Sequence, residues 1–366
     1  MAGRDREWMG QALALAATVE GSTSPNPRVG CLLVSGDEVV GRGRHRVAGG
    51  PHAEAVALAE AGERARGATL YVSLEPCAHH GRTPPCVDLL LAAGVSRVVA
   101  ALKDPDPRVD GRGFARLREH GVEVDVGLLD EPAHELNAPF MKHHAAGRPL
   151  VTLKVAGSLD GLISARGGEA RWITGPAARR FAHRLRLRHD AVLVGAATVR
   201  RDDPRLTVRL PGVQRQPLRV VLSGRLDFDA NAAVFDDRAP TRVYTVDGAP
   251  RERLPEGVDA REVPTREGQA DLEAVLRDLA EDGVQSVLVE GGGRTLATFL
   301  RAGLADRAAL FSAPRAIGAQ GATPMLDMPA AATPAAGWRV SRDRLIVLGP
   351  DLLLLGRIHA PRESGG

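Results

Sequence analysis

The chain has 366 residues, of which 44% are hydrophobic and 25% are charged, and its net charge is +3 at pH 7. This composition is typical of a globular protein, and the length suggests two domains. No apolar run is long enough to cross a membrane, and the short apolar stretch after Gln11 does not form a secretory signal. We therefore expect a cytoplasmic protein that does not bind membranes.

Charge distribution and cysteine content exclude two further classes of protein. Basic residues alternate with acidic ones, and aromatic residues make up only 3% of the chain. Nucleic-acid-binding proteins usually concentrate basic residues in one patch and interleave aromatic residues. Three cysteines are too few for a disulfide scaffold of this length. Neither a nucleic-acid partner nor a disulfide framework is expected.

Alternating strand and helix patterns fill the first part of the chain. Apolar residues at helical spacing predict a helix over 7–20, and a hairpin signal follows over 29–34 and 38–40. The remaining predicted helices cover 53–61, 87–93 and 114–120, and the remaining predicted strands cover 69–74, 97–102 and 122–126. Such alternation indicates an α/β fold in which helices cover a sheet.

A connector and a second α/β pattern follow. Residues 127–149 are predicted to be irregular, because Pro132 and Pro139 interrupt them. The predicted strands beyond cover 151–156, 191–194, 219–222, 241–245 and 285–289, and the predicted helices cover 175–188, 269–281 and 294–302. We expect two domains, over 1–146 and 147–366.

His52, Cys77 and Cys86 form the strongest local motif, with Glu54 two residues after the histidine. One imidazole and two thiolates are typical of a zinc site that leaves its fourth position open to water. A carboxylate that does not bind the metal can then transfer protons. The order His-x-Glu followed by Pro-Cys matches the pattern of zinc nucleobase deaminases. The sequence therefore predicts one zinc ion per chain and a hydrolytic deamination in which Glu54 is catalytic.

Other interpretations of these residues remain open. Each ligand alone could be an ordinary buried or helix-starting residue, and His79 or His80 could replace a ligand or contact the substrate. Cys31 lies in an apolar strand, so we expect it to pack in the core. A nucleoside or nucleic-acid deaminase, and a zinc-stabilised binding protein without activity, are the alternative functions.

The spacing of the cysteines separates this motif from most cytidine and adenosine deaminases. Those enzymes have two residues between the cysteines, whereas eight separate Cys77 from Cys86. The segment Glu-Pro-Cys-Ala-His-His-Gly-Arg-Thr-Pro-Pro-Cys, which ends at Cys86, resembles the deaminase domain of the bifunctional riboflavin-biosynthesis deaminase/reductases. Residues 24–30, 41–45 and 104–113 agree with this resemblance, although Asp106 stands where relatives typically carry asparagine.

This resemblance implies a cytidine-deaminase-like three-layer domain. It implies a small phosphorylated substrate, a diaminopyrimidinone that carries a ribosylamino 5′-phosphate and loses its ring amine as ammonia. It also implies that Asn26, His45 and His79 line the substrate pocket.

Glycines in the second part of the chain point less clearly to a ligand. The run Glu-Gly-Gly-Gly-Arg-Thr-Leu over 290–296 follows a predicted strand and opens a predicted helix. Backbone amides there could hold a phosphate, but Leu296 stands where a dinucleotide-binding fingerprint requires a third glycine. The residues alone leave an anion site and a plain tight turn equally open. A P-loop is excluded, because none of the three lysines follows a glycine.

Residues 153–161, 171–175, 191–198 and 202–209 resemble the reductase domain of the same family, which has a dihydrofolate-reductase-like fold and uses NADPH. The resemblance implies reduction of the ribosyl group to ribityl. It implies cofactor contacts by Ala156, Trp172, Thr198, Asp202, Ser223, Gly292, Gly293, Arg294, Thr295, Leu296, Ala297 and Thr298. It implies substrate contacts by Lys154, Ala170, Arg186, Leu206, Arg209 and Glu290, with the arginines pairing the phosphate.

Several of these assignments have alternatives. Arg184 or Arg188 could replace Arg186, and Lys154 could form a salt bridge at the end of a strand instead of assisting the reaction. Ala170 occupies a position where a relative supplies a serine hydroxyl, so that contact would be lost or made by the backbone. The sequence leaves homo-oligomerisation open.

Overall fold

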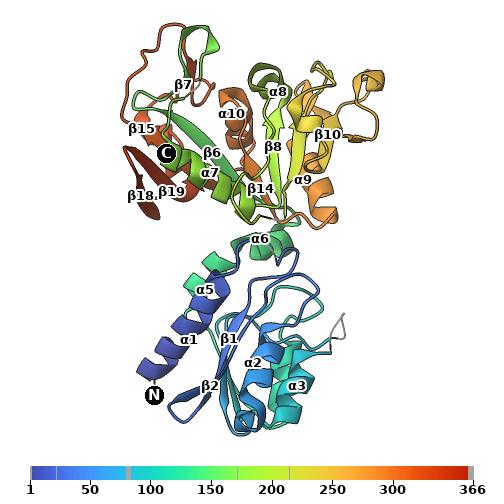
Figure 1. The fold of residues 1–366 in the computed structure, drawn as a ribbon, viewed down its shortest axis with the longest axis vertical. Helices are drawn as coiled ribbons and strands as arrows, with labels where there is room; N and C mark the ends of the chain where they lie inside the picture. Colours follow the sequence, from blue (N-terminus) through green and yellow to red (C-terminus); the bar gives the residue numbers. More distant parts are fainter. Residues whose placement is uncertain (1, 22, 80–83, 171, 214, 362–366) are drawn as a thin grey trace. The chain divides into compact units, whose positions relative to one another are not determined.

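The structure is a computed structural model that describes residues 2–21, 23–79, 84–170, 172–213 and 215–361. The chain divides into two compact units, Met1–Gly147 and Arg148–Gly366, and each unit is built on a sheet of its own (Figure 1). Both units mix strands and helices, so the predicted α/β class is confirmed. Among the described helices, none is both long enough and apolar enough to span a membrane.

The first unit contains a five-stranded sheet with the order β2-β1-β3-β4-β5. β1 is antiparallel to β2 and β3, whereas β3, β4 and β5 are parallel. The strands are Gly30–Ser35 (β1), Glu38–Arg44 (β2), Thr69–Val72 (β3), Arg97–Ala100 (β4) and Glu123–Val126 (β5). The helices are Ala2–Ala17 (α1), Ala53–Ala61 (α2), Cys86–Ala93 (α3), Arg112–Glu119 (α4), Asp130–Leu136 (α5) and Ala138–Ala146 (α6).

Helices cover both faces of this sheet. Side chains alternate along β1, so that Cys31 and Leu33 pack in one core with α2, α3 and α4, while Leu32 and Val34 pack in another with α1. Cys31 has no exposed surface, as predicted for a core residue. The result is a three-layer unit in which α2 and α3 share one face of the sheet (Figure 1).

The prediction of an irregular connector over 127–149 is wrong, because α5 and α6 occupy most of it. Pro132 and Pro139 both fall in the first turn of a helix. A proline is tolerated there, because the amide hydrogen that it lacks has no partner within the helix. These prolines therefore begin helices rather than interrupt them.

The second unit contains a ten-stranded sheet with the order β11-β10-β9-β8-β14-β6-β15-β19-β17, and β18 pairs with β19. Its strands are Leu150–Ser158 (β6), Ala191–Gly195 (β8), Leu218–Leu222 (β9), Thr241–Thr245 (β10), Asp259–Glu262 (β11), Ser286–Val289 (β14), Arg307–Ala313 (β15), Arg339–Val340 (β17), Arg344–Leu348 (β18) and Asp351–His359 (β19). Two small sheets pair Leu162–Ser164 (β7) with Thr323–Pro324 (β16), and Thr265–Arg266 (β12) with Gln269–Ala270 (β13). The sequence pattern did not assign β15, β18 or β19.

Four helices cover this sheet: Pro176–Arg188 (α7), Ala196–Asp202 (α8), Leu272–Glu281 (α9) and Gly293–Arg301 (α10). α9 and α10 pack against one face, where Leu276 and Phe299 join Val151 in one core. α7 and α8 pack against the other face, where Leu185 and Val199 belong to a second core. The loops after β6, β8 and β14, which run parallel, therefore meet at one edge of the sheet.

Candidate functional site

Three predicted zinc ligands come together in the first unit. His52 immediately precedes α2, Cys77 lies in the loop after β3, and Cys86 is the first residue of α3. Their ligand atoms all lie within 4.8 Å of one another. His52 Nδ1 is 3.2 Å from Cys86 Sγ and 3.5 Å from Cys77 Sγ. The position of Cys86 at the beginning of α3 also favours a thiolate there, because the helix dipole is positive at that end.

The chemistry of these three residues fits a zinc ion. A hydrogen bond from the Cys86 thiol lowers the pKa of Cys77, which favours the thiolate that a zinc ion binds. The backbone amide of Cys86 also donates to Cys77 Sγ, at 3.3 Å. One nitrogen and two sulfur donors leave a tetrahedral ion one position for water.

Glu54 is a buried carboxylate beside these ligands. It lies in the first turn of α2 and is only 3% exposed. Burial and, to a lesser extent, the charge of Cys77 raise the pKa of Glu54 to about 7. A carboxyl group with this pKa can both accept and donate a proton near neutral pH.

Two of the predicted substrate contacts, Asn26 and His45, are joined to each other. His45 Nδ1 is 3.0 Å from the carbonyl oxygen of Pro51, which can only accept, so this nitrogen carries the proton. His45 Nε2 then accepts from Asn26 Nδ2 at 3.1 Å. Burial lowers the pKa of His45, which keeps the imidazole neutral and preserves this arrangement. The His45 and His52 rings lie edge to face, with centroids 5.5 Å apart, so the pair borders the metal ligands.

His79 is the third predicted contact. Its Nδ1 is buried and has no hydrogen-bond partner within the described residues. A buried imidazole nitrogen without a partner is costly unless a ligand satisfies it. His80, the competing candidate, lies outside the described residues.

Glu75 has a structural role that the sequence did not reveal. Its buried carboxylate accepts hydrogen bonds from the backbone amides of Asp104, Gly111, Gly113 and Phe114, at 2.9 to 3.3 Å. Glu75 therefore fixes the loop over 104–113 beside the segment that carries Cys77. The only sequence signal was its place before Pro76 in the cysteine motif.

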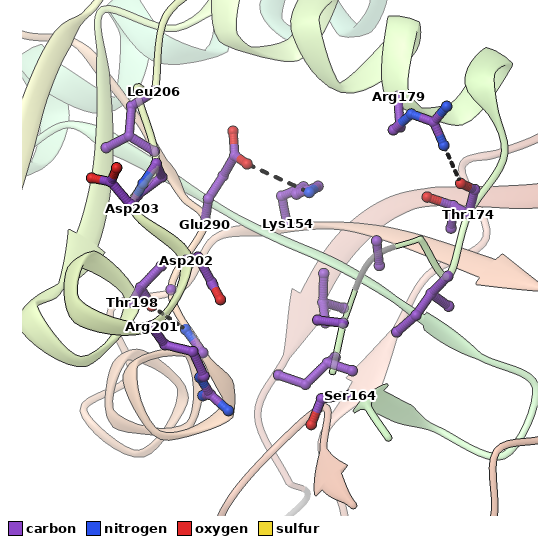
Figure 2. A pocket seen from close by; sticks show the side chains of 18 of the residues that line it. Lys154, Ser164, Thr174, Arg179, Thr198, Arg201, Asp202, Asp203, Leu206 and Glu290 are labelled. Carbon is purple, nitrogen blue, oxygen red and sulfur yellow. Dashed lines mark hydrogen bonds and ion pairs between the residues drawn. The ribbon is translucent and has the colours of Figure 1, made fainter. Parts of the chain in front are cut away.

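The second unit has a cavity of about 650 Å³, part of which is shown in Figure 2. All six predicted substrate contacts line it: Lys154, Ala170, Arg186, Leu206, Arg209 and Glu290. Five predicted cofactor contacts also line it: Ala156, Trp172, Thr198, Asp202 and Gly292. Lys154 and Ala156 reach it from alternate positions of β6, as the period of a strand requires.

The carboxylate of Glu290 is the centre of an ion-pair network in this cavity. Arg186 donates to it through two nitrogens, at 2.6 and 3.0 Å, and Lys154 Nζ lies 3.5 Å from Oε2 (Figure 2 shows the Lys154 pair). Burial alone would raise the pKa of Glu290, but the charges of Arg186 and Lys154 outweigh it and hold the pKa well below its ordinary value. Glu290 is therefore ionised, and Lys154 forms a salt bridge with it from the middle of β6 rather than from the end of a strand.

The structure changes the expectation that Arg186 pairs the phosphate with two parallel hydrogen bonds. Arg186 Nε and Nη2 already donate to Glu290, and Nη1 donates to the carbonyl oxygen of Thr207 at 2.9 Å. Arg209 and Arg205 also line the cavity. Burial and the nearby charges of Arg186 and Arg205 lower the pKa of Arg209, so this wall carries excess positive charge. An anion fits beside Arg209 and Arg205 better than beside Arg186.

The beginning of α10 has space for a phosphate group. Gly292 precedes the helix, and its amide donates to Thr198 Oγ1 at 3.3 Å. A Cβ at Gly292 would stand 3.9 Å from that same oxygen, inside the cavity. The glycines and the helix dipole therefore fit the diphosphate of a dinucleotide.

The other predicted cofactor contacts do not line the cavity: Ser223, Gly293, Arg294, Thr295, Leu296, Ala297 and Thr298. Leu296 is buried in the core that α10 covers, and Ala297 has no exposed surface, so neither side chain can face a ligand there. Ser223 is buried just after β9, and its hydroxyl has no hydrogen-bond partner within the described residues. For the residues within α10, any contact would come from the backbone.

Some cavity residues were not predicted. They include Ser164, Thr174, Arg179, Arg201, Asp203 and Arg205.

Two local features stand out in this cavity. The guanidinium of Arg179 lies over the exposed Trp172 ring, 4.5 Å from its centroid. Leu206 has a φ of 54°, a strained value for a side chain with a Cβ, and such strain occurs mainly where a site requires it. For Arg201, Asp203 and Arg205, the repeated arginines and aspartates over 200–209 were the only sequence signal.

Each of the two units matches a known protein family. Residues 149–354 match the RibD C-terminal domain, and residues 3–102 match the cytidine and deoxycytidylate deaminase zinc-binding region. The riboflavin biosynthesis protein RibD of Aquifex aeolicus is 45% identical over 86% of this chain and 88% of its own length. The chain belongs to the RibD family.

Solved RibD structures have the same overall fold. RibD of Acinetobacter baumannii superposes with a TM-score of 0.90 at 38% identity and covers 98% of this chain and 100% of its own. A diaminohydroxyphosphoribosylaminopyrimidine deaminase/5-amino-6-(5-phosphoribosylamino)uracil reductase of Thermotoga maritima gives a TM-score of 0.86 at 34% identity, covering 96% and 98%. The expected family, a deaminase-like domain followed by a reductase-like domain, is thereby confirmed.

Proposed function

We propose that this RibD chain catalyses two consecutive steps of riboflavin biosynthesis. The first is zinc-dependent hydrolytic deamination of 2,5-diamino-6-(5-phosphoribosylamino)pyrimidin-4(3H)-one. The second is NADPH-dependent reduction of the ribosyl group, which gives 5-amino-6-(5-phosphoribitylamino)uracil. The observation that carries the proposal is the grouping of His52, Cys77 and Cys86 around the buried Glu54, in a chain whose other unit has the Glu290 cavity. The substrate is a small molecule, and the reactions are placed in the cytoplasm.

Glu54 moves the protons of the deamination. A zinc ion held by His52, Cys77 and Cys86 would act as a Lewis acid and would lower the pKa of a bound water molecule to about 7. Glu54 accepts a proton from the water whose oxygen bonds to the ring carbon. It then delivers a proton to the amine, and the carbon–nitrogen bond breaks to release ammonia. We assign His79 to orient the ring, since a substrate would satisfy its unpartnered Nδ1, and we assign Asn26 to the same pocket by the family resemblance.

In the second unit the chain's own groups orient the substrate and hold its charge. NADPH, when bound, would supply a hydride to the imine-like carbon that is exposed when the ribosyl ring opens, and a proton from solvent would complete the amine. Glu290, fixed by Arg186 and Lys154, can accept hydrogen bonds from the sugar hydroxyls. Arg209 pairs the 5′-phosphate. It lines one wall of the cavity together with Arg186 and Arg205, and the single charge of Glu290 neutralises only part of their positive charge.

The test is to incubate the purified chain with the diaminopyrimidine, with and without NADPH, and to identify the products. Without NADPH, ammonia is released and the deaminated ribosylamino compound accumulates. With NADPH, the ribityl product replaces it, and one NADPH is oxidised for each ammonia released. A chain that releases ammonia from free cytidine or single-stranded DNA instead would be the alternative deaminase. A chain that binds zinc without turnover would be the inactive binding protein.

A further inference from the structure

Arg201 lines the cavity of the second unit but has no part in the reaction as described above. It lies near the end of α8, three residues after Thr198 and next to Asp202. Its guanidinium group makes no ion pair or hydrogen bond with any residue that the structure describes. The preceding arginine differs, because Arg200 pairs with Asp227 at 2.6 Å.

The guanidinium of Arg201 lies beside the beginning of α10. A Cβ at Gly292 would stand 3.9 Å from Arg201 Nη2 and the same distance from Thr198 Oγ1. A Cβ at Gly168, in the loop after β7, would stand 3.7 Å from Arg201 Nη1. Arg201 therefore spans the space between that loop and the helix that carries the glycines. Figure 2 shows Thr198, Arg201 and Asp202 together on one side of the cavity.

Positive groups and backbone amides around this point can bind an anion, although two carboxylates, Asp202 and Asp203, also line the cavity beside Arg201. The carboxylate of Asp203 is engaged by the backbone amide of Ala233, at 2.7 Å. The nine-residue helix α10 directs its positive end to the same space. Glycine at 292 also leaves the backbone open to close approach.

We propose that Arg201 binds the diphosphate of the dinucleotide cofactor, opposite the N-terminus of α10 and beside the Thr198 hydroxyl. The inference rests on the proposed reductase function and adds to it a cofactor-binding side chain. Guanidinium suits this place, because its planar fork can donate two parallel hydrogen bonds to phosphate oxygens. A lysine would keep the positive charge, but its ammonium group could not donate two parallel hydrogen bonds to the phosphate.

The experiment measures binding of NADP⁺ and NAD⁺ to the zinc-loaded full chain by calorimetry, with competition for weak binders. Arg201→Gln should raise the Kd of both dinucleotides about tenfold, which corresponds to about 1.4 kcal/mol. Arg201→Lys should raise the Kd by a smaller factor. Higher salt should reduce the difference in Kd between each variant and the wild type. The matched control is Arg200→Gln on the same helix, which should leave both Kd values within twofold of wild type. Thermal unfolding of each variant reports whether the second unit is folded, because ammonia release depends on the first unit alone.

Two results would overturn the assignment. Unchanged NADP⁺ binding in Arg201→Gln would show that the arginine does not touch the cofactor. A rise in the Kd of NADP⁺ alone would place Arg201 at the 2′-phosphate rather than the diphosphate. A wild-type chain that binds neither dinucleotide would instead contradict the proposed reductase function, so the two failures are distinct.

Discussion

Glu54 and Glu290 are both buried carboxylates, yet their surroundings shift their pKa values in opposite directions. Burial beside a thiolate raises the pKa of Glu54 to about 7. Arg186 and Lys154 overcome the same effect of burial at Glu290 and lower its pKa. The first group is suited to proton transfer, and the second is suited to hold a permanent negative charge.

The charge of Glu290 should stabilise the fold in a pH-dependent way. Replacing Glu290 with Gln leaves Arg186 and Lys154 without their shared counter-charge, so we expect a loss of about 3 kcal/mol at pH 7. Because the folded-state pKa of Glu290 lies below its ordinary value of 4.5, its stabilisation is complete above that pH and is lost as the pH falls. The difference between wild type and variant should therefore shrink below about pH 4.5.

Denaturant unfolding of both proteins at several pH values measures this difference. The exposed Glu256 provides a control, since Glu256→Gln should change the free energy of unfolding by less than about 0.5 kcal/mol. A Glu290→Gln penalty that stays constant from pH 7 to pH 3 would contradict the account of this ion pair.

At the scale of elements, the contact between β2 and α2 positions the deaminase residues. His52 and Glu54 both lie at the beginning of α2, which packs closely on β2. A Cβ at Gly43 would overlap the carbonyl oxygen of Ala53, the first residue of that helix. The glycine therefore permits the close approach that sets the position of the zinc ligand.

Gly43→Ala should move the beginning of α2 away from the sheet. We expect a loss of about 1–3 kcal/mol in the free energy of unfolding, together with a lower zinc content, because His52 shifts with the helix. Gly10→Ala in α1 is the matched control, since no atom lies within 4 Å of a Cβ there. That variant should instead be stabilised by about 0.5–1 kcal/mol. Unchanged stability and zinc content in Gly43→Ala would contradict this prediction.

The elements also show what the sequence could and could not predict. Glu54 and the three candidate ligands could be identified from spacing, because a metal site constrains both residue type and local order. The helices α5 and α6 were missed, because their prolines were taken as breaks rather than as first-turn residues. The positions of Glu75 and Arg201 could not be predicted, since they depend on loops far apart in the chain.

At the scale of the whole molecule, the two candidate sites share no residue. The zinc ligands and Glu54 lie within residues 1–147, and the Glu290 cavity lies within residues 148–366. We therefore expect the two reactions to be separable, although one chain carries both. The alternative deaminase assignments give no reason for the second unit, whereas membership of the RibD family does.

Removal of zinc should separate the two reactions. A chelator should abolish ammonia release from the diaminopyrimidine, because His52, Cys77 and Cys86 would have no ion to hold. Reduction of the supplied deaminated compound should continue at its original rate, as followed by NADPH absorbance. Added zinc should restore ammonia release. If chelation stopped both reactions equally, the proposed independence of the sites would be wrong.

The most direct test of the central claim is NADPH oxidation by the Glu54→Gln chain with each of the two pyrimidines. Its zinc content should equal that of the wild type, since Glu54 is not among the three candidate ligands. With the deaminated compound the variant should oxidise NADPH at the wild-type rate. With the diaminopyrimidine, its rate of NADPH oxidation should fall about 10²–10⁴-fold, because no general acid or base remains for deamination. Wild-type oxidation with the diaminopyrimidine would contradict the claim that deamination by Glu54 supplies the substrate of the reductase.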